Sequence, residues 1–415
     1  MELTKKQRFY RILLLGLLSA IGPFSIDMYL PGFPAIAADL HASVDQVSYS
    51  LSSFFVGICA GQMLCGPLLD RFGRKRPLYV GLALYVVASL GCAVAGSIEA
   101  LIGFRFLQAL GGCVGMVAPR AIVRDTFPVS ENAKVFSMLI LVIGVSPIIA
   151  PSAGSFVVTA FGWHAVFLVL ALVTALLLVA VFFFLPESKP LDPSFSLKPK
   201  PILSNFMLVL KEPQFYTYAF TGAIASAGLY AYLSGSPFVF MELFKVSEQH
   251  YSLVFAIIAI GLITSSQLNN LLLKNYTSEQ IIRWALRTQA VVGLLLAIGT
   301  VTHLLELYST IFLLFLFLSC QGFSFPNASA LSMAPFSKEA GSASALMGAI
   351  QMGLGAIASA AVGWFFNGTA LPMTAVMAGC ALTSLVVLGF GRKQIAYKTA
   401  WADVEEQAFD LIERY

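Results

Sequence analysis

The chain has 415 residues, of which 58% are hydrophobic and only 11% are charged, with 25 Lys and Arg against 21 Asp and Glu. A soluble domain is typically about 45–50% apolar and about 25% charged, so this composition excludes a soluble enzyme, a disordered chain and a nucleic-acid-binding protein. A membrane β-barrel is also excluded, because its alternating strands give a much weaker hydropathy signal. The composition therefore predicts an all-α polytopic membrane protein.

The N-terminal apolar segment is predicted to be a retained first membrane span. Four basic residues between positions 5 and 11 precede it, and Ala35-Ile36-Ala37 resembles a signal-peptide cleavage site. The apolar stretch from Ile12 to Ile36, however, is far longer than the 7–15 residues of a signal-peptide core, and more spans follow.

Twelve membrane spans, in two groups of six, are expected because a helix needs about 20 apolar residues to cross a bilayer. The first group is predicted at residues 9–34, 46–69, 77–97, 100–122, 134–158 and 164–185. The second group is predicted at residues 214–237, 249–273, 280–302, 308–333, 340–365 and 371–391.

The longest polar gap contains six prolines. Repeated proline removes backbone donors and blocks helix continuation, so this gap is predicted to be a linker. The chain is thus divided into a six-helix bundle, a cytoplasmic linker, a second six-helix bundle and a cytoplasmic tail at residues 1–185, 186–213, 214–395 and 396–415. The tail has the periodicity of an amphipathic acidic helix, and a disordered end is the alternative.

The positions of Lys and Arg predict the topology, because positively charged loops stay in the cytoplasm. With twelve crossings and the N-terminus inside, 23 of the 25 Lys and Arg fall on the cytoplasmic side. Of the other two, Lys245 lies in an outer loop and Arg105 lies within a span. Both termini are therefore expected in the cytoplasm.

An approximate internal repeat relates the two halves. Phe104-Arg105-Phe106-Leu107-Gln108 precedes the Gly-rich fifth span, and Phe317-Leu318-Ser319-Cys320-Gln321 precedes the Gly-rich eleventh span. Internal repeats are typical of transporters whose binding site lies between the halves. Leu318 takes the place of Arg105, so the buried charge belongs to the N-terminal half.

Asp27 and Arg105 are the clearest charged residues inside predicted spans. At 1.5 Å rise per residue, both lie ~6–8 Å outward of the centre of their span, so a direct or water-mediated ion pair is expected. A static pair that locks two helices is one interpretation. In the other, Asp27 takes up and loses a proton during transport, because burial favours the neutral acid whereas a nearby Arg favours the carboxylate. The two residues form the candidate proton-coupling site.

Other polar and aromatic residues within the spans are candidates for a substrate cavity. Gln108 and Gly112 follow Arg105 at +3 and +7, which places them on the same helix face. The alternative for Gln108 is an interhelical hydrogen bond, and the alternative for the aromatic residues is packing or lipid contact. The cavity candidates are Tyr29, Tyr49, Gln108, Gly112, Tyr230, Tyr232, Gln321, Asn327 and Gln351.

The segment from Gly66 to Arg76, between spans two and three, combines basic residues with an acid and glycines. Asp70 could accept hydrogen bonds from the N-terminus of span eleven near Gly341, where the helix dipole is positive. Gly73 would permit a tight turn. We interpret the segment as a conformational latch whose gating motif comprises Gly66, Asp70, Arg71, Gly73 and Arg74.

Span five contains two prolines and several small residues. Proline removes helical hydrogen bonds and kinks a helix, and small residues permit close packing. A kinked, closely packed helix suits an interface that must rock, although Pro and Gly are common in membrane helices in general. The relevant residues are Gly144, Pro147, Pro151 and Gly154.

No metal site, cofactor or enzymatic centre is expected. The six cysteines lie in apolar stretches without the spacing of metal ligands. The four histidines lie in outer loops or near span ends, and no Ser/His/Asp cluster accompanies them.

Together these motifs resemble the major facilitator superfamily over the chain up to about Lys398. The segment Gly66…Asp70-Arg71…Gly73-Arg74-Lys75 is similar to the family's loop 2–3 motif, and Arg105…Gln108 to its fourth-helix motif. The Gly144…Pro147 stretch is loosely similar to its fifth-helix antiporter motif. The segment Ile26-Asp27-Met28-Tyr29-Leu30-Pro31-Gly32 resembles the first helix of the bicyclomycin-resistance (Bcr/CflA) type of drug:proton antiporters.

The resemblance implies proton-driven export of small amphipathic drugs from a bacterial cytoplasm, through a cavity that opens alternately to each side. It implies the inner membrane as location, the proton gradient in place of a cofactor, and Asp70 and Arg71 in gating. A small molecule, protons and lipid are the expected partners, without nucleic acid, and the chain is expected to act as a monomer. The alternative within the same fold is an exporter or symporter of a metabolite such as an amino acid, nucleoside or siderophore.

Overall fold

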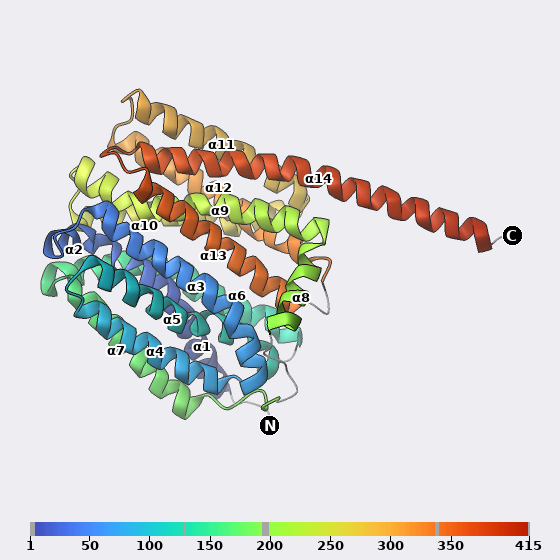
Figure 1. Cartoon of the computed structure of the whole chain (residues 1–415), viewed down its shortest axis with the longest axis horizontal. Coiled ribbons are helices and arrows are strands. Elements are labelled where there is room, and N and C mark those ends of the chain that lie inside the picture. The colour runs from blue at the N-terminus through green and yellow to red at the C-terminus, as the bar shows by residue number, and fades with distance from the viewer. Residues whose placement is uncertain (1–4, 128, 193–198, 337–339, 414–415) are drawn as a thin grey trace.

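The computed structural model describes residues 5–127, 129–192, 199–336 and 340–413, and every regular element within these ranges is a helix (Figure 1). The N-terminal half comprises α1 (Lys5–Asp27), η1 (Leu30–Gly32), α2 (Phe33–Asp39), α3 (Val44–Phe72), α4 (Lys75–Ala93), α5 (Ile98–Thr126), α6 (Val129–Phe161) and α7 (Trp163–Phe184). After α8 (Pro199–Leu210), the C-terminal half comprises α9 (Pro213–Pro237), η2 (Phe238–Leu243), α10 (Glu248–Leu272), α11 (Ser278–Val301), α12 (Leu307–Met333), α13 (Ala340–Trp364) and α14 (Leu371–Glu413).

Twelve segments of the described chain are long and apolar enough to cross a bilayer, and each corresponds to one predicted span. The twelve-span, all-α fold class is therefore confirmed. The fifth span, predicted at 134–158, lies within α6. The predicted linker also contains a helix, α8, which its proline content did not suggest. Phe206 and Val209 of α8 pack against α9 and α13.

The first span is broken immediately after Asp27, where α1 ends. Pro31 has no N–H to donate to the carbonyl of Asp27 four residues earlier, so the α-helical pattern cannot continue. The chain instead makes the 3₁₀ turn η1 and resumes as the short helix α2. The carboxyl of Asp27 is thereby placed at a helix end in the interior, with its side chain 5% exposed.

α5 forms the packing centre of the N-terminal half. Both α3 and α4 pack along it, whereas they contact each other little. Glycine allows this close approach, because a Cβ at Gly111 would lie 2.6 Å from the carbonyl oxygen of Gly81. A Cβ at Gly57 would likewise lie 2.6 Å from the carbonyl oxygen of Phe106.

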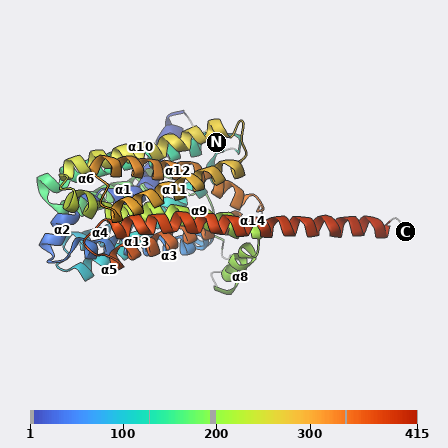
Figure 2. The same cartoon turned by 90° about the horizontal axis from the view of Figure 1, so that it is seen from above.

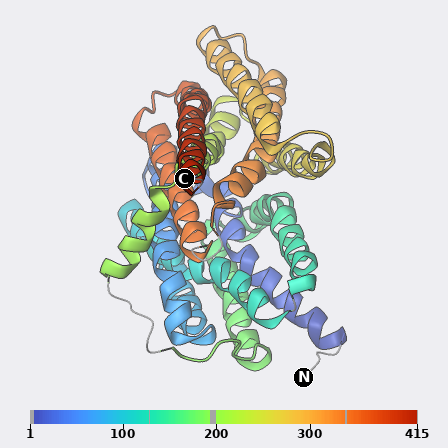
Figure 3. The same ribbon diagram turned by 90° about the vertical axis from the view of Figure 1, so that its right-hand side faces the viewer.

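The two halves lie side by side, and their helices run between the same two ends of the molecule (Figures 1 and 2). We call them the basic end, where Arg74, Lys189 and Lys211 lie, and the acidic end, where Asp45 and Glu248 lie. α14 continues from the basic end well beyond the other helices (Figure 3 looks along it). The side chains from position 397 onward, on which the predicted amphipathic tail depends, lie outside the described ones.

The halves contact each other along α3 with α13 and along α6 with α10. The hydroxyls of Ser52 and Ser359 lie 2.8 Å apart, and the thiol of Cys59 donates to the carbonyl of Ala349 at 3.3 Å. On the other side, the hydroxyl of Ser252 donates to the carbonyl of Pro151 at 3.0 Å. These contacts extend from the acidic end to the middle of the helices.

Candidate functional site

Arg105 is fully buried inside the N-terminal half. Its guanidinium donates to the side-chain oxygen of Gln108 at 2.6 Å and to the backbone carbonyl of Ser25 at 3.0 Å. The rings of Tyr29 and Phe54 lie 4.3 and 4.1 Å from its central carbon. Aromatic faces and carbonyl dipoles therefore stabilise the charge here, since cation–π contacts contribute about 2 kcal/mol or more when desolvated.

The direct Asp27–Arg105 ion pair that we expected is absent from this structure. Within the described chain, the Asp27 carboxyl makes neither an ion pair nor a hydrogen bond. The prediction from equal depth did not account for the helix break after Asp27. The carboxyl of Asp27 instead lies toward the C-terminal half. There the buried phenols of Tyr232 and Tyr251 lie close enough to interact electrostatically with Asp27.

A polar network that sequence reasoning missed extends from Arg105 into the N-terminal half. The amide of Gln108 donates to the hydroxyl of Ser89 at 2.8 Å, and Ser25 and Tyr85 pair through their hydroxyls at 2.5 Å. Three helices, α1, α4 and α5, supply these groups. The sequence signal was a serine in each of two apolar spans, Ser25 and Ser89. Serine is too common in membrane helices for this signal to single out these two residues.

The four tyrosine candidates all lie at or near the contact between the halves. The hydroxyls of Tyr29 and Ser50 lie 3.0 Å apart within the N-terminal half. The ring of Tyr49 packs against Gly363 of the C-terminal half, where a Cβ would lie 2.9 Å from the ring. The ring of Tyr230 packs edge-on against Phe55 across the interface, with 4.7 Å between centroids. The Tyr232 hydroxyl is buried without a hydrogen-bond partner among the described residues.

Most of the other cavity candidates pack inside their own half. The amide of Gln321 donates to Ser226, and that of Asn327 donates to Asn269 at 2.7 Å. Gly112 allows the ring of Tyr85 to approach, because a Cβ there would lie 2.8 Å from it. Gln351 of α13 also interacts within its own half, with the phenol of Tyr230 on α9. A role for these residues in substrate binding stays a prediction.

The loop between α3 and α4 is held by a network of charges within the N-terminal half. Arg74 donates to Asp125 on α5 at 2.7 Å and to Asp70 at 3.2 Å, and Lys189 pairs with Asp70 at 2.8 Å. Burial lowers the pKa of the Arg74 guanidinium, but its bonds to Asp125 and Asp70 outweigh burial and the pKa is raised. Arg74 is therefore a permanent charge that joins α3, α4 and α5.

The turn itself depends on Gly73 and Glu187. Gly73 has φ +77°, which favours glycine, and a Cβ there would lie 2.9 Å from the carboxylate of Glu187. That carboxylate accepts the backbone N–H groups of Arg74 and Lys75 at 2.7 and 3.1 Å. Glu187 thus caps the N-terminus of α4, where the helix dipole favours negative charge.

Among the described residues, Asp70 makes no contact with span eleven, and the residues at 337–339 that precede this span lie outside the described ranges. Asp70 is instead occupied by Arg74 and Lys189, and a Cβ at Gly341 would meet open space. Gly66 also faces open space, and Arg71 lies 5.7 Å from the ring of Phe72. A gating role for this segment stays a prediction.

α6 remains helical through both of its prolines and connects the two halves. Gly154 packs directly against the backbone of Met28, so this glycine accommodates the break after α1. The carbonyl of Pro151 accepts from Ser252 of α10, and α6 runs along α10. Open space surrounds Gly144, and Ile143 next to it accepts from the hydroxyl of Ser146 at 2.6 Å.

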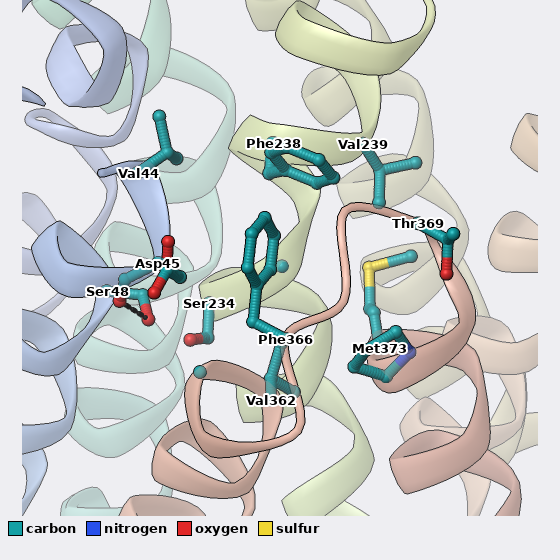
Figure 4. Close-up of a pocket in the computed structure, with 13 residues that line it drawn as sticks. Val44, Asp45, Ser48, Ser234, Phe238, Val239, Val362, Phe366, Thr369 and Met373 are labelled. Carbon is teal, nitrogen blue, oxygen red and sulfur yellow. Dashed lines mark hydrogen bonds between the residues drawn. The ribbon is translucent and has the colours of Figure 1, made fainter.

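A small pocket lies between the halves at the acidic end (Figure 4). Val44, Asp45 and Ser48 at the start of α3 face Phe238, Phe366 and other residues of the C-terminal half. Asp45 is the one charged residue among those lining it. Within the described residues, no group of three or more His, Cys, Asp and Glu could hold a metal ion.

Comparison with known proteins identifies a family. The model of the Major Facilitator Superfamily matches residues 15–360. An MFS-type transporter, YdgK of Bacillus subtilis, is 34% identical over 94% of this chain and 98% of its own length. A bicyclomycin resistance protein homolog of Haemophilus influenzae is 31% identical over 93% of this chain and 97% of its own length. The multidrug resistance protein MdtL of Escherichia coli is 30% identical over 89% of this chain and 92% of its own length.

Solved structures show the same fold. A bacterial homolog of the human lysosomal transporter Spinster, in an inward-facing and unoccupied conformation, matches with a TM-score of 0.68, covering 94% of this chain and 96% of its own. A D-xylose–proton symporter matches with a TM-score of 0.69, and the match covers 92% of this chain and 97% of the symporter chain. Sequence identities of 16% and 15% limit this likeness to the fold. The matches confirm the resemblance noted in the sequence.

Proposed function

The chain belongs to the Major Facilitator Superfamily, and from that premise we propose that it exports small amphipathic drugs from the bacterial cytoplasm in exchange for protons. Relatives named for bicyclomycin and multidrug resistance, each about 30% identical over most of the chain, support drugs as the substrate class. The basic end is the cytoplasmic end in this proposal, in agreement with the positive-inside rule.

The observation that carries the proton coupling is the setting of Asp27. It is a buried carboxyl at the interface between the halves, and within the described chain it has no counter-ion. Burial and the negative end of a helix dipole both favour the uncharged acid. A group of this kind binds a proton when the interface encloses it and releases the proton when water enters.

The geometry of the interface supports alternating access. Contacts near Ser52 and Ser252 hold the halves together toward the acidic end, while Asp70 at the basic end bonds within its own half. In the proposed orientation these contacts between the halves lie toward the outer side, which must separate to release the drug. Closure of the cytoplasmic side would bring Asp70 toward the N-terminus of α13.

The test of the proposed function is drug-dependent proton movement in proteoliposomes that contain the purified protein and a pH-sensitive dye. Addition of a substrate should release protons from the lumen, and a proton gradient should drive uptake of the drug. A susceptibility panel in an efflux-deficient host selects the drugs. Unchanged susceptibility across chemically diverse drugs would contradict drug export and favour the metabolite alternative.

A disulfide between the halves should stop transport. In a background without the six native cysteines, we expect Ser52→Cys with Ser359→Cys to cross-link readily, because the two hydroxyls lie 2.8 Å apart. Oxidation should reduce drug efflux at least tenfold, and a reductant should restore it, since the acidic end must open for release. Each single variant serves as a control. Full activity of the cross-linked protein would contradict opening at this end.

A further inference from the structure

An apolar groove opens on the outer surface of the N-terminal half, away from the interface between the halves. Its walls come from α3 and α4, and its floor comes from α5. It has a volume of about 430 Å³. Its lining includes Leu64 of α3, Arg76, Val80 and Gly81 of α4, and Leu110 and Gly111 of α5.

The groove exists because α3 and α4 diverge while both pack on α5. Gly81 and Gly111 let α4 approach α5 closely, and the side chains of Leu110 and Val114 of α5 form the floor. Leu64 and Val80 on the walls are 54% and 71% exposed, so the groove faces the bilayer and not the protein interior. A hollow in the lipid-facing surface is filled by acyl chains.

Arg76 is the only charged residue that lines the groove, and it lies at the basic end. Its side chain is exposed, and among the described residues no carboxylate lies within ion-pair distance of it. The neighbouring Arg74, by contrast, is bound to Asp70 and Asp125. Arg76 therefore offers an uncompensated guanidinium beside the membrane surface.

The length of the groove matches one leaflet. From Arg76 to Leu84, eight residues of α4 rise ~12 Å toward the membrane centre. Half of the hydrocarbon core of a bilayer is about 15 Å thick. A lipid whose headgroup lies at Arg76 would thus place its acyl chain along the whole groove.

We propose that this groove is a binding site for an anionic glycerophospholipid of the inner leaflet. The headgroup phosphate pairs with the Arg76 guanidinium, and an acyl chain occupies the space between α3 and α4 above Gly111. Basic residues between membrane helices on the cytoplasmic side are suited to anionic headgroups. The bound lipid would support the loop network of Arg74 from the membrane side.

The test compares lipid retention and stability of the detergent-purified full chain. Native mass spectrometry should show phosphatidylglycerol retained by the native protein, and its addition should raise Tm by several degrees more than phosphatidylcholine with the same chains does. Arg76→Gln should abolish this difference. Lys274→Gln is the matched control, because Lys274 is exposed in the equivalent loop of the C-terminal half. It should leave the difference intact.

Two further arms identify the site and the ligand. Val80→Trp, at an exposed position that tolerates a large side chain, should fill the groove and lower phosphatidylglycerol retention at least fivefold. Glycerol 3-phosphate alone should leave Tm unchanged. Equal shifts with both lipids, a shift with glycerol 3-phosphate, equal losses in the Arg76 and Lys274 variants, or full retention by the Val80 variant would each overturn the proposal.

Discussion

Replacement of Asp27 by Asn is expected to abolish proton-coupled drug transport. Asparagine has nearly the same shape as aspartate and cannot ionise, so the fold and the drug site should persist while the proton site is lost. We expect drug-dependent proton release in proteoliposomes to fall at least tenfold. Movement of drug down its own gradient should continue, because the interface between the halves is unchanged.

The controls separate a proton site from a structural role. Asp27→Glu keeps an ionisable group and should retain part of the coupled activity. Glu99→Gln makes the equivalent change at an exposed carboxylate of the acidic end and should be neutral. Normal drug-dependent proton exchange by the Asp27→Asn variant would refute the coupling role of this residue.

Replacement of Arg105 by Lys is expected to damage both stability and transport, although the charge is kept. Lysine cannot reach Gln108 and the Ser25 carbonyl with two separate N–H groups while it lies flat between the rings of Tyr29 and Phe54. Loss of a buried hydrogen bond to a charged group costs about 1.5–3 kcal/mol. We expect a clearly lower Tm and transport reduced at least tenfold.

A second variant at this position distinguishes folding from function. Arg105→Leu introduces the residue found at the equivalent position of the other half, Leu318, which is buried there in apolar surroundings. We expect it to recover much of the Tm lost in the Lys variant but not transport. Arg124→Lys, at an exposed position on the same helix, is the matched control. Wild-type transport by Arg105→Leu would show that the buried charge is dispensable.

The spans could be predicted well because their main cause is local. Each requires only about 20 apolar residues between polar loops, and composition along the chain supplies that information directly. α8 escaped prediction because its stability depends on contacts between Phe206 and helices far away in the sequence. Its two leading prolines at 199 and 201 suit the first turn of a helix as well as they suit a linker.

The arrangement at the candidate site was less predictable. The depth of a residue in the membrane can be estimated by counting residues along its span. The direction in which the Asp27 side chain points depends also on where the helix ends, and residue counting does not show that. Pro31 ends α1 at Asp27, and the sequence showed this proline without showing where the carboxyl would point. The partners of Arg105 are a backbone carbonyl and two rings, which no search for opposite charges could find.

The weakness of the polar contacts between the halves has a consequence for energy conversion. The pair Ser52–Ser359 and the bond from Ser252 to Pro151 join uncharged groups. Each contributes about 0.5–1.5 kcal/mol. One pH unit at a titrating group corresponds to about 1.4 kcal/mol. If transport is coupled to protons as proposed, a single proton carried down a modest gradient would supply free energy comparable to that of these two bonds.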